Sequence, residues 1–218
     1  MTIRAVVKGV GHYLPERIVE NSEFEASLDT SDEWIQARSG IKRRHFAAEG
    51  EKTSDMATNA AQAALADAGL EPDDLDAVIV ATSTADFTFP SAATSVQSGL
   101  NMTSGFAYDV QAVCAGFVFA LSTANAQILS GQAKRVMVIG AESFSRLMDW
   151  EDRATCVLFG DGAGAVVLQA EQGEGSSDDR GILSVNLNSD GRYKDILYVD
   201  GGVSTGQTGY LRMQGKEV

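Results

Sequence analysis

The chain contains two cysteines, and Cys114 is the one that stands where a nucleophile is expected. It follows an apolar stretch that ends at Val110 and opens an Ala-rich stretch that runs to Leu129. We expect a helix over residues 114–129, so that unpaired backbone N–H groups and the helix dipole favour the thiolate of Cys114. Gly116 leaves room for a substrate to approach the backbone. The alternative is a small buried hydrophobic residue, which is the commoner role of a free cysteine.

Cys156 is an internal control for this interpretation. It lies in the apolar stretch 155–159 with no helix start beside it, so we expect it to pack in the interior. Two cysteines in such different settings do not form a disulfide framework, which indicates a reducing compartment. The first eight residues carry charges within their only apolar stretch and resemble neither a signal peptide nor a membrane span. We therefore expect a cytoplasmic protein with no membrane partner.

The charge balance limits the partners of the chain. Thirty acidic and seventeen basic residues give a net charge of −13, which argues against a broad nucleic-acid surface. The two Cys and two His residues show no metal-ligand spacing, so no metal site is expected. One dense basic group suits a phosphate-bearing ligand or an acidic protein, or is simply a solvated face. Its members are Arg38, Lys42, Arg43, Arg44 and His45.

Apolar stretches alternate with helical patterns along the first 170 residues. Strands are expected at residues 4–10, 76–82, 106–110, 135–140 and 164–168. Helices are expected after a Thr30 or Ser31 cap, over residues 54–69 with Ser54 or Thr53 as the cap, from Ser91 to about Leu100, and over 114–129. Glycines and a proline predict a loop over residues 9–15. The alternation indicates an α/β fold, with a mixed, largely parallel sheet and helices on both faces.

A polar, glycine-rich stretch over residues 171–180 is the best candidate for a boundary. Residues 1–170 would form one half that carries Cys114, and residues 171–218 would form a linker and the beginning of a second half. A fresh strand is expected over 181–189, followed by glycine-rich sequence with little helical periodicity. Because an isolated strand needs a covering layer, we expect the fold to continue beyond Val218.

Five short segments together closely resemble β-ketoacyl-acyl carrier protein synthase III, a family of the thiolase superfamily. They are TSDEWI at 30–35, RSGI at 38–41, FPSAA at 89–93, VCAGF at 113–117 and FGDGAGA at 159–165. The resemblance implies a thiolase-like fold of two similar α/β halves, usually in a homodimer, of which this chain holds the N-terminal portion. It also implies the initiating condensing enzyme of bacterial type II fatty acid synthesis.

By this resemblance Cys114 accepts an acetyl group from acetyl-CoA as a thioester, and covalent capture divides the condensation into two easier steps. Malonyl-acyl carrier protein then loses carbon dioxide, and its enolate attacks the thioester in a decarboxylative Claisen condensation. The backbone N–H of Cys114 would be one oxyanion donor. The thioester of CoA is a substrate, and no cofactor is implied.

The resemblance also implies binding residues. The CoA adenine would stack on Trp34, with Arg38, Arg153 and Thr30 at other CoA-contacting positions. The alternative to CoA binding is that Trp34 is a core residue and that Arg153 forms a surface ion pair, which contributes little to stability.

The acyl pocket is implied at three aromatic positions. Phe89 would reach across the dimer to line it, while Phe144 and Phe159 would form other walls. Bulky phenylalanines at these places suggest a short primer such as acetyl.

The family's catalytic His and Asn lie in the second half and have no counterpart here. His12 and His45 match neither position and are expected to be structural or surface residues. A complementary C-terminal polypeptide or segment would have to supply the missing pair. The glycines of 160–164 lack the Lys-Ser/Thr of a phosphate loop, and we expect them to form a tight turn near the nucleophile.

Two other functions remain open from the sequence. The first keeps the fold and changes the substrate: another condensing enzyme of the thiolase superfamily, such as a polyketide or hydroxymethylglutaryl-type synthase. The second is a non-catalytic half that serves dimerisation or binding, and such a half would expose apolar surface without its complement.

Overall fold

The computed structural model describes residues 2–218, which divide into two compact units, each built from three separate segments of the chain. The first unit comprises the chain up to Leu14, Glu51–Glu142 and Gly162–Leu187. The second unit comprises Pro15–Gly50, Ser143–Asp161 and Asn188–Val218. The division expected from the sequence, into residues 1–170 and 171–218, stays a prediction.

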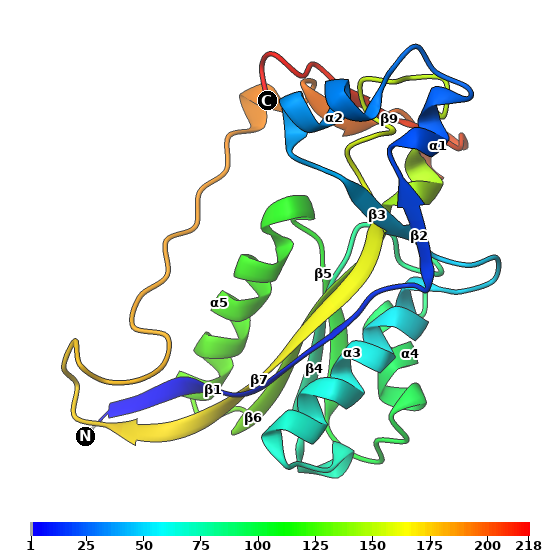
Figure 1. The fold of residues 1–218 in the computed structure, drawn as a ribbon. Coiled ribbons are helices and arrows are strands. Elements are labelled where there is room, and N and C mark those ends of the chain that lie inside the picture. Colours follow the sequence, from blue (N-terminus) through cyan, green and yellow to red (C-terminus); the bar gives the residue numbers. More distant parts are fainter. Residues whose placement is uncertain (1) are drawn as a thin grey trace. The chain divides into compact units, whose positions relative to one another are not determined.

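Nearly all of a five-stranded sheet lies in the first unit, with the strand order β1-β7-β6-β4-β5 (Figure 1). β4 pairs in parallel with β5 and with β6, whereas β1 pairs antiparallel with β7. The strands are β1 (Thr2–Tyr13), β4 (Ala77–Ala81), β5 (Phe106–Val110), β6 (Arg135–Ser143) and β7 (Asp161–Gly173). The helices of this unit are α3 (Thr53–Ala68), the short 3-10 helices η1 (Pro72–Asp74) and η2 (Val113–Ala115), α4 (Ala92–Gly99) and α5 (Gly116–Leu129). The expected mixed α/β sheet is confirmed.

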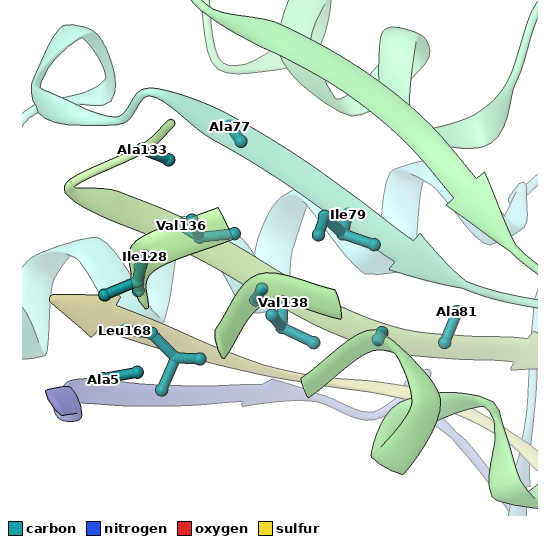
Figure 2. Packing of buried hydrophobic residues seen from close by; sticks show 11 residues of the cluster. Ala5, Ala77, Ile79, Ala81, Ile128, Ala133, Val136, Val138 and Leu168 are labelled. Atoms are coloured by element: carbon teal, nitrogen blue, oxygen red, sulfur yellow. The ribbon is translucent and has the colours of Figure 1, made fainter. Parts of the chain in front are cut away.

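Helices cover both faces of this sheet, with α5 on one face and α3 and α4 on the other (Figure 1). All five residues of β4 are buried, because alternate side chains of a central strand point to opposite covered faces. Ile79 packs toward α5, where Ala120 and Ala124 present small side chains that let the helix approach the sheet (Figure 2). The other members of this cluster are Ala5, Ala77, Ala81, Ile128, Ala133, Val136, Val138 and Leu168.

The loop expected over residues 9–15 is wrong, because β1 continues to Tyr13. Its glycines serve helix packing instead. A Cβ at Gly9 would lie 2.4 Å from the carbonyl oxygen of Ala64, and a Cβ at Gly11 would lie 2.3 Å from that of Ala60. Both carbonyls belong to α3, so glycine permits α3 to lie directly on the strand backbone.

The caps expected for α3, Ser54 or Thr53, are also wrong. The helix begins at Thr53, and Ser54 lies inside its first turn, where its backbone N–H and hydroxyl both donate to the carboxylate of Asp86 (3.0 and 2.5 Å). Asp86, distant in sequence, thus accepts from the first turn, while the carboxylate of Asp55 accepts locally from the backbone N–H of Lys52 (2.9 Å). At the other end, Gly69 adopts a left-handed φ of 66° and ends the helix as expected.

The second unit contains two small antiparallel sheets, one formed by β2 and β3 and one by β8 and β9. Its strands are β2 (Arg17–Glu20), β3 (Arg43–Phe46), β8 (Leu197–Val199) and β9 (Leu211–Met213). Its helices are α1 (Ser22–Glu25), α2 (Asp32–Ser39) and the 3-10 helices η3 (Phe144–Leu147), η4 (Gly191–Tyr193) and η5 (Val203–Thr205). Its core is the cluster of Val19, Phe24, Ile35, Phe46, Phe144, Met148, Cys156, Val157 and Leu211.

The strand expected over 181–189 does not form, since a strand needs a ladder partner. Within the described part of the chain, its one backbone hydrogen bond joins the N–H of Ile182 to the carbonyl of Ala5 (3.0 Å). No helix in residues 2–218 is long and apolar enough to cross a membrane. The same residues contain no group of three or more His, Cys, Asp or Glu side chains arranged to hold a metal ion.

Candidate functional site

Cys114 lies in η2, the single turn between β5 and α5. Its side chain is exposed, whereas Cys156 is fully buried. The helix was expected to begin at Cys114, but α5 begins at Gly116, so the thiol precedes the helix by one tight turn. Val113 has a φ of 48°, a left-handed conformation that β-branched residues rarely adopt. Strain of this kind persists where the surrounding structure fixes it, and it is common next to reactive groups.

Two backbone features surround this thiol. In the described residues no acceptor is hydrogen-bonded to the N–H of Cys114, which leaves that donor available. Gly116 is buried, and a Cβ placed on it would lie 3.3 Å from the Cβ of Ala81. The glycine therefore allows α5 to pack on β4, and the expectation that it leaves room for a substrate stays a prediction.

Glu142 is a half-buried carboxyl at the end of β6 that sequence analysis missed. β4, β5 and β6 run in parallel, so their carboxyl ends meet at one edge of the sheet. There Glu142 accepts hydrogen bonds from the backbone N–H of Ser83 (2.8 Å) and the hydroxyl of Thr84 (2.5 Å). Burial raises the pKa of Glu142, and these hydrogen bonds oppose the shift in part. The sequence feature that could have indicated this site is the single carboxylate, Glu142, near the end of a largely apolar strand.

Phe89 stands on the segment between β4 and α4 and is 82% exposed. Asp109 fixes the helix that follows, because its carboxylate accepts from the N–H groups of Ala92 and Ala93 (both 2.8 Å). Phe144 and Phe159 belong to the second unit, where their rings stack with centroids 5.3 Å apart. The structure thus pairs two of the three expected pocket residues and leaves Phe89 open to solvent in the first unit.

Trp34 is the centre of a cationic and aromatic cluster in the second unit. Ser31 caps α2 by accepting from the N–H of Trp34 (3.1 Å), as one of the two expected caps. One turn later Arg38 places its guanidinium carbon 4.2 Å from the indole centroid, and that of Arg153 lies at 5.3 Å. The hydroxyl of Thr30 is buried and has no partner in the described residues. The four expected CoA residues therefore come from one unit, and three of them are in contact.

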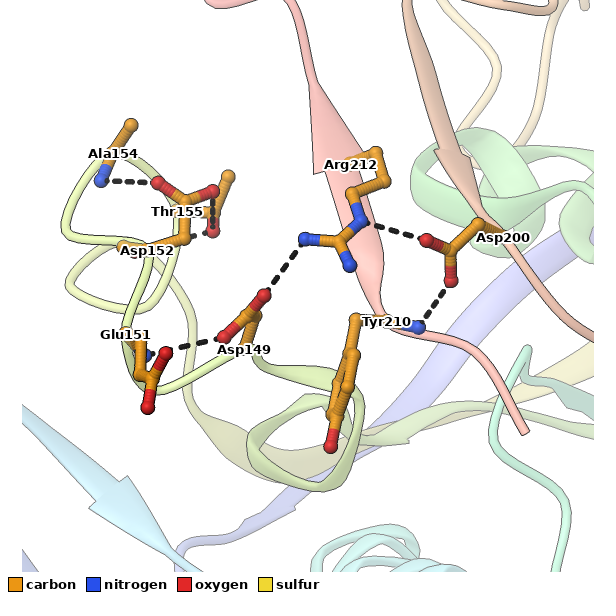
Figure 3. Close-up of polar contacts among 8 residues, drawn as sticks. All are labelled: Asp149, Glu151, Asp152, Ala154, Thr155, Asp200, Tyr210 and Arg212. Atoms are coloured by element: carbon orange, nitrogen blue, oxygen red, sulfur yellow. Dashed lines mark hydrogen bonds and ion pairs between the residues drawn. The ribbon is translucent and has the colours of Figure 1, made fainter.

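Asp29 holds the guanidinium of Arg153. The guanidinium donates to the Asp29 carboxylate (3.0 Å) and also to the backbone carbonyl of Asp29. The loop that carries Arg153 is a tight turn fixed by Asp152 (Figure 3). The two oxygens of that carboxylate accept from the N–H of Ala154 (3.0 Å) and the hydroxyl of Thr155 (2.8 Å). The turn therefore presents the arginine from a rigid backbone.

Arg212 braces the start of the same loop (Figure 3). Its guanidinium donates to Asp149 (2.8 Å) and Asp200 (2.7 Å), so it links the loop to β8 and β9. Hydrogen bonds from Arg212 lower the pKa of both carboxyl groups, and the two carboxylates raise the pKa of Arg212. Sequence analysis missed this brace, because its members are far apart along the chain.

The dense basic group of the sequence does not stay together. Arg38 lies against Trp34, Arg44 is buried, and Lys42 and Arg43 are exposed. His45 is close to the carbonyl oxygen of Pro15 (2.5 Å from Nδ1). His12 is exposed on β1.

The glycines of 160–164 do not form the expected turn beside the nucleophile. Residues from Asp161 onward belong to β7, where extended backbone replaces a turn. The carboxylate of Asp161 instead accepts from the N–H groups of Ala47 and Ser145 (both 2.8 Å). Gly160 lies against Arg44, since a Cβ there would be 3.0 Å from the Cβ of that arginine.

Comparisons with known proteins agree with this architecture. Residues 108–191 match the family model described as 3-oxoacyl-[acyl-carrier-protein (ACP)] synthase III. Proteins named beta-ketoacyl-[acyl-carrier-protein] synthase III from Ruegeria sp. (strain TM1040) and Roseobacter denitrificans are each 76% identical over all of this chain, which covers 68% of their length.

Solved structures give the same result. The 3-oxoacyl-[acyl-carrier-protein] synthase III of Aquifex aeolicus superimposes with a TM-score of 0.88 at 45% identity, over 98% of this chain and 65% of that one. The priming β-ketosynthase of the R1128 polyketide pathway gives 0.86 at 30% identity, over 100% of this chain and 66% of that one. The chain thus spans about two thirds of the length of these relatives. It belongs to the β-ketoacyl-[acyl-carrier-protein] synthase III family, the acyl-transferring condensing enzymes that initiate type II fatty acid synthesis, and it has their thiolase-like fold.

Proposed function

We propose that this chain supplies the nucleophile and the CoA site of an initiating condensing enzyme. The thiolate of Cys114 attacks the carbonyl carbon of acetyl-CoA, the carbon–sulfur bond to CoA breaks, and CoA leaves as its thiolate. The acetyl group remains on Cys114 as a thioester. The exposed thiol of Cys114, beside a strained Val113, is the observation that carries this proposal.

The second step is a condensation with malonyl-acyl carrier protein. Its carbon–carbon bond to the carboxylate breaks, carbon dioxide leaves, and the electron pair forms an enolate. The enolate carbon attacks the acetyl thioester, and the Cys114 thiolate departs. The unpaired N–H of Cys114 is suited to stabilise the oxyanion that develops in both steps.

CoA recognition is assigned to the cluster around Trp34. The adenine would stack on its indole ring, and the two guanidinium groups of Arg38 and Arg153 would bind the phosphates. The buried, unpartnered hydroxyl of Thr30 supports a ligand here, because buried polar groups ordinarily have partners. Thioester chemistry of this kind needs no cofactor or metal.

The His and Asn that activate the malonyl group are assigned to a complementary C-terminal polypeptide or segment. His45 lies 2.5 Å from a backbone carbonyl, His12 is on the edge strand β1, and neither matches the family's catalytic positions. The relatives are longer than this chain by a third of their own length, which leaves room for that portion.

The acyl pocket is assigned to Phe144, Phe159 and, from a second copy in a homodimer, Phe89. The exposure of Phe89 at 82% and of Phe87 at 53% supports burial against another subunit. A cytoplasmic location is assigned, supported by two unpaired cysteines. A net charge of −13 opposes nucleic-acid binding, and no membrane partner is assigned.

The test is the mass of the protein after incubation with acetyl-CoA. An acetyl adduct should form on Cys114 and be absent from Cys114→Ser, with Cys156→Ser as the matched control that still reacts. The experiment is repeated with a second-half chain from a relative. Absence of the adduct in its presence would overturn the proposal. CoA binding and dimerisation without acylation would instead favour a non-catalytic half.

A further inference from the structure

A polar network buried in the second unit connects the elements that carry Trp34 and Arg153. Its centre is Arg44 in β3, which is 6% exposed. The guanidinium of Arg44 donates to the carbonyl of Val157 and to Oδ1 of Asn21, both at 2.8 Å, and to the carbonyl of Val19 at 3.3 Å. Burial lowers the pKa of Arg44, but a guanidinium remains charged at neutral pH.

Arg44 has no ion-pair partner among the residues the structure describes. A buried charge is costly and is ordinarily paired with an opposite charge. Here three neutral acceptors from two separate segments, 19–21 and Val157, take that place, and the ring of Phe24 lies 4.9 Å from the guanidinium carbon. The charge therefore fixes the positions of these acceptors.

Asn21 connects Arg44 to Ile41 and Asp32. It is 1% exposed, and its amide is fully used: Oδ1 accepts from Arg44, while Nδ2 donates to the carbonyl of Ile41 (2.7 Å) and to Oδ1 of Asp32 (2.8 Å). Each end of the amide faces partners of the opposite kind, so one orientation satisfies all three contacts. Asn21 is thus a rigid link between Arg44 and Asp32.

Asp32 is the first residue of α2, two residues before Trp34. Its second oxygen accepts from Nε2 of Gln36 (2.7 Å). Hydrogen bonds from Asn21 and Gln36 lower the pKa of Asp32, so its carboxylate stays ionised and its hydrogen bonds are charge-assisted. The start of α2 is therefore fastened to the network.

We propose that Arg44, Asn21 and Asp32 are positioning residues for CoA, which set the helix of Trp34 against the loop of Arg153. The link at Val157 lies four residues after Arg153, and the link at Asp32 lies two residues before Trp34. The network fixes both backbones, so a nucleotide entering beside Trp34 displaces the side chain of Arg153 and leaves the helix in place. This inference rests on the proposed CoA site.

The test compares CoA affinity among variants by isothermal titration calorimetry, below the unfolding temperature of each. Asn21→Ala removes the link, and Asp32→Asn weakens it with almost no change of shape. Val19→Ala is the control, because it truncates a side chain that is 2% exposed in the same core and keeps the backbone carbonyl through which Val19 accepts from Arg44. Asn21→Ala should weaken CoA binding about tenfold and Asp32→Asn several-fold. Val19→Ala should lower stability and leave the affinity unchanged.

The outcomes are distinct. If the parent chain binds CoA and both network variants bind it within twofold of the parent, the positioning role is wrong and the CoA site stands. If Val19→Ala loses affinity as strongly as Asn21→Ala, the network acts only through stability, and the proposal is overturned. If Asn21→Ala does not fold, Asp32→Asn decides alone. If the parent itself does not bind CoA, the proposed CoA site fails, and this inference fails with it.

Discussion

Arg153 lies over the indole of Trp34 while its guanidinium is hydrogen-bonded to Asp29. The ring that is assigned to a nucleotide base is therefore already covered by a cation. Under the proposed assignment, CoA binding would replace Arg153 by the base on this ring and would break an exposed ion pair of little energetic weight.

Replacing Trp34 should weaken CoA binding. A cation–π or stacking contact is worth about 0.5–2 kcal/mol, so Trp34→Ala should raise the Kd for CoA by about 2- to 30-fold. Calorimetric titration with CoA measures this. Trp150→Phe, at the other tryptophan of the chain, is the control and should bind as the parent does. Unchanged affinity of Trp34→Ala would contradict the assignment.

The two cysteines should differ in reactivity toward an alkylating reagent in the native protein. Cys114 is exposed, and Cys156 is completely buried with its pKa raised by burial to about 11. At pH 8 we expect iodoacetamide to modify Cys114 and to spare Cys156 until the protein unfolds. Peptide mass spectrometry reports the two sites separately. Equal modification under native conditions would show that the core around Cys156 opens readily.

The same thiol predicts a pH dependence of stability. Cys156 has an ordinary pKa near 9 in the unfolded chain and about 11 in the folded protein. The folded state keeps the proton that the unfolded state releases, so stability from this group is complete below pH 9 and is lost as the pH rises toward 11. Denaturation by urea at several pH values should show a steeper decline for the parent than for Cys156→Ala. Parallel curves would contradict the shift.

Glu142 should give a similar effect at lower pH. Burial raises its pKa in the folded protein, so the folded state binds a proton that the unfolded state releases above the ordinary pKa of 4.5. The stability advantage of the parent over Glu142→Gln should therefore shrink as the pH rises above 4.5. The free energy of unfolding of both proteins measures it. An advantage that grows with pH would mean that the folded protein favours the carboxylate.

Gly11 should not tolerate a side chain. A Cβ there would lie 2.3 Å from the carbonyl oxygen of Ala60, so Gly11→Ala forces β1 and α3 apart and should cost about 1–3 kcal/mol of stability. Gly164→Ala is the matched control, since Gly164 pairs with the neighbouring His12 across β1 and β7 and a Cβ there meets no atom within 4 Å. Thermal unfolding distinguishes them, and equal effects would contradict the close-approach argument.

The sequence predicted the elements whose causes are local. β5 forms at the predicted residues 106–110, and the end of α3 follows from Gly69, because glycine accepts a left-handed φ at little cost. The Ser31 cap of α2 is local as well. The sequence predicts the start of α5 two residues early, at Cys114, and it does not predict the left-handed Val113, because no sequence pattern indicates a strained valine.

The sequence could not predict what depends on partners distant in the chain. Gly9 and Gly11 were predicted to be loop residues, because the helix that packs on them, α3, lies about fifty residues later in the sequence. The basic residues from Arg38 to His45 were predicted to form one surface group, but folding buries Arg44 and leaves Lys42 exposed. A strand was predicted over residues 181–189 from their composition, but a strand forms only where a sheet edge is available for it to pair with.

β1 and β7 are the first and last strands of the sheet along the chain, and their pairing joins Thr2 to Gly173. During synthesis on the ribosome the first strand therefore emerges long before its ladder partner exists. Such non-local pairing is slow, and it leaves an apolar strand exposed in the meantime. The nascent chain should thus be a client of chaperones until β7 has left the exit tunnel.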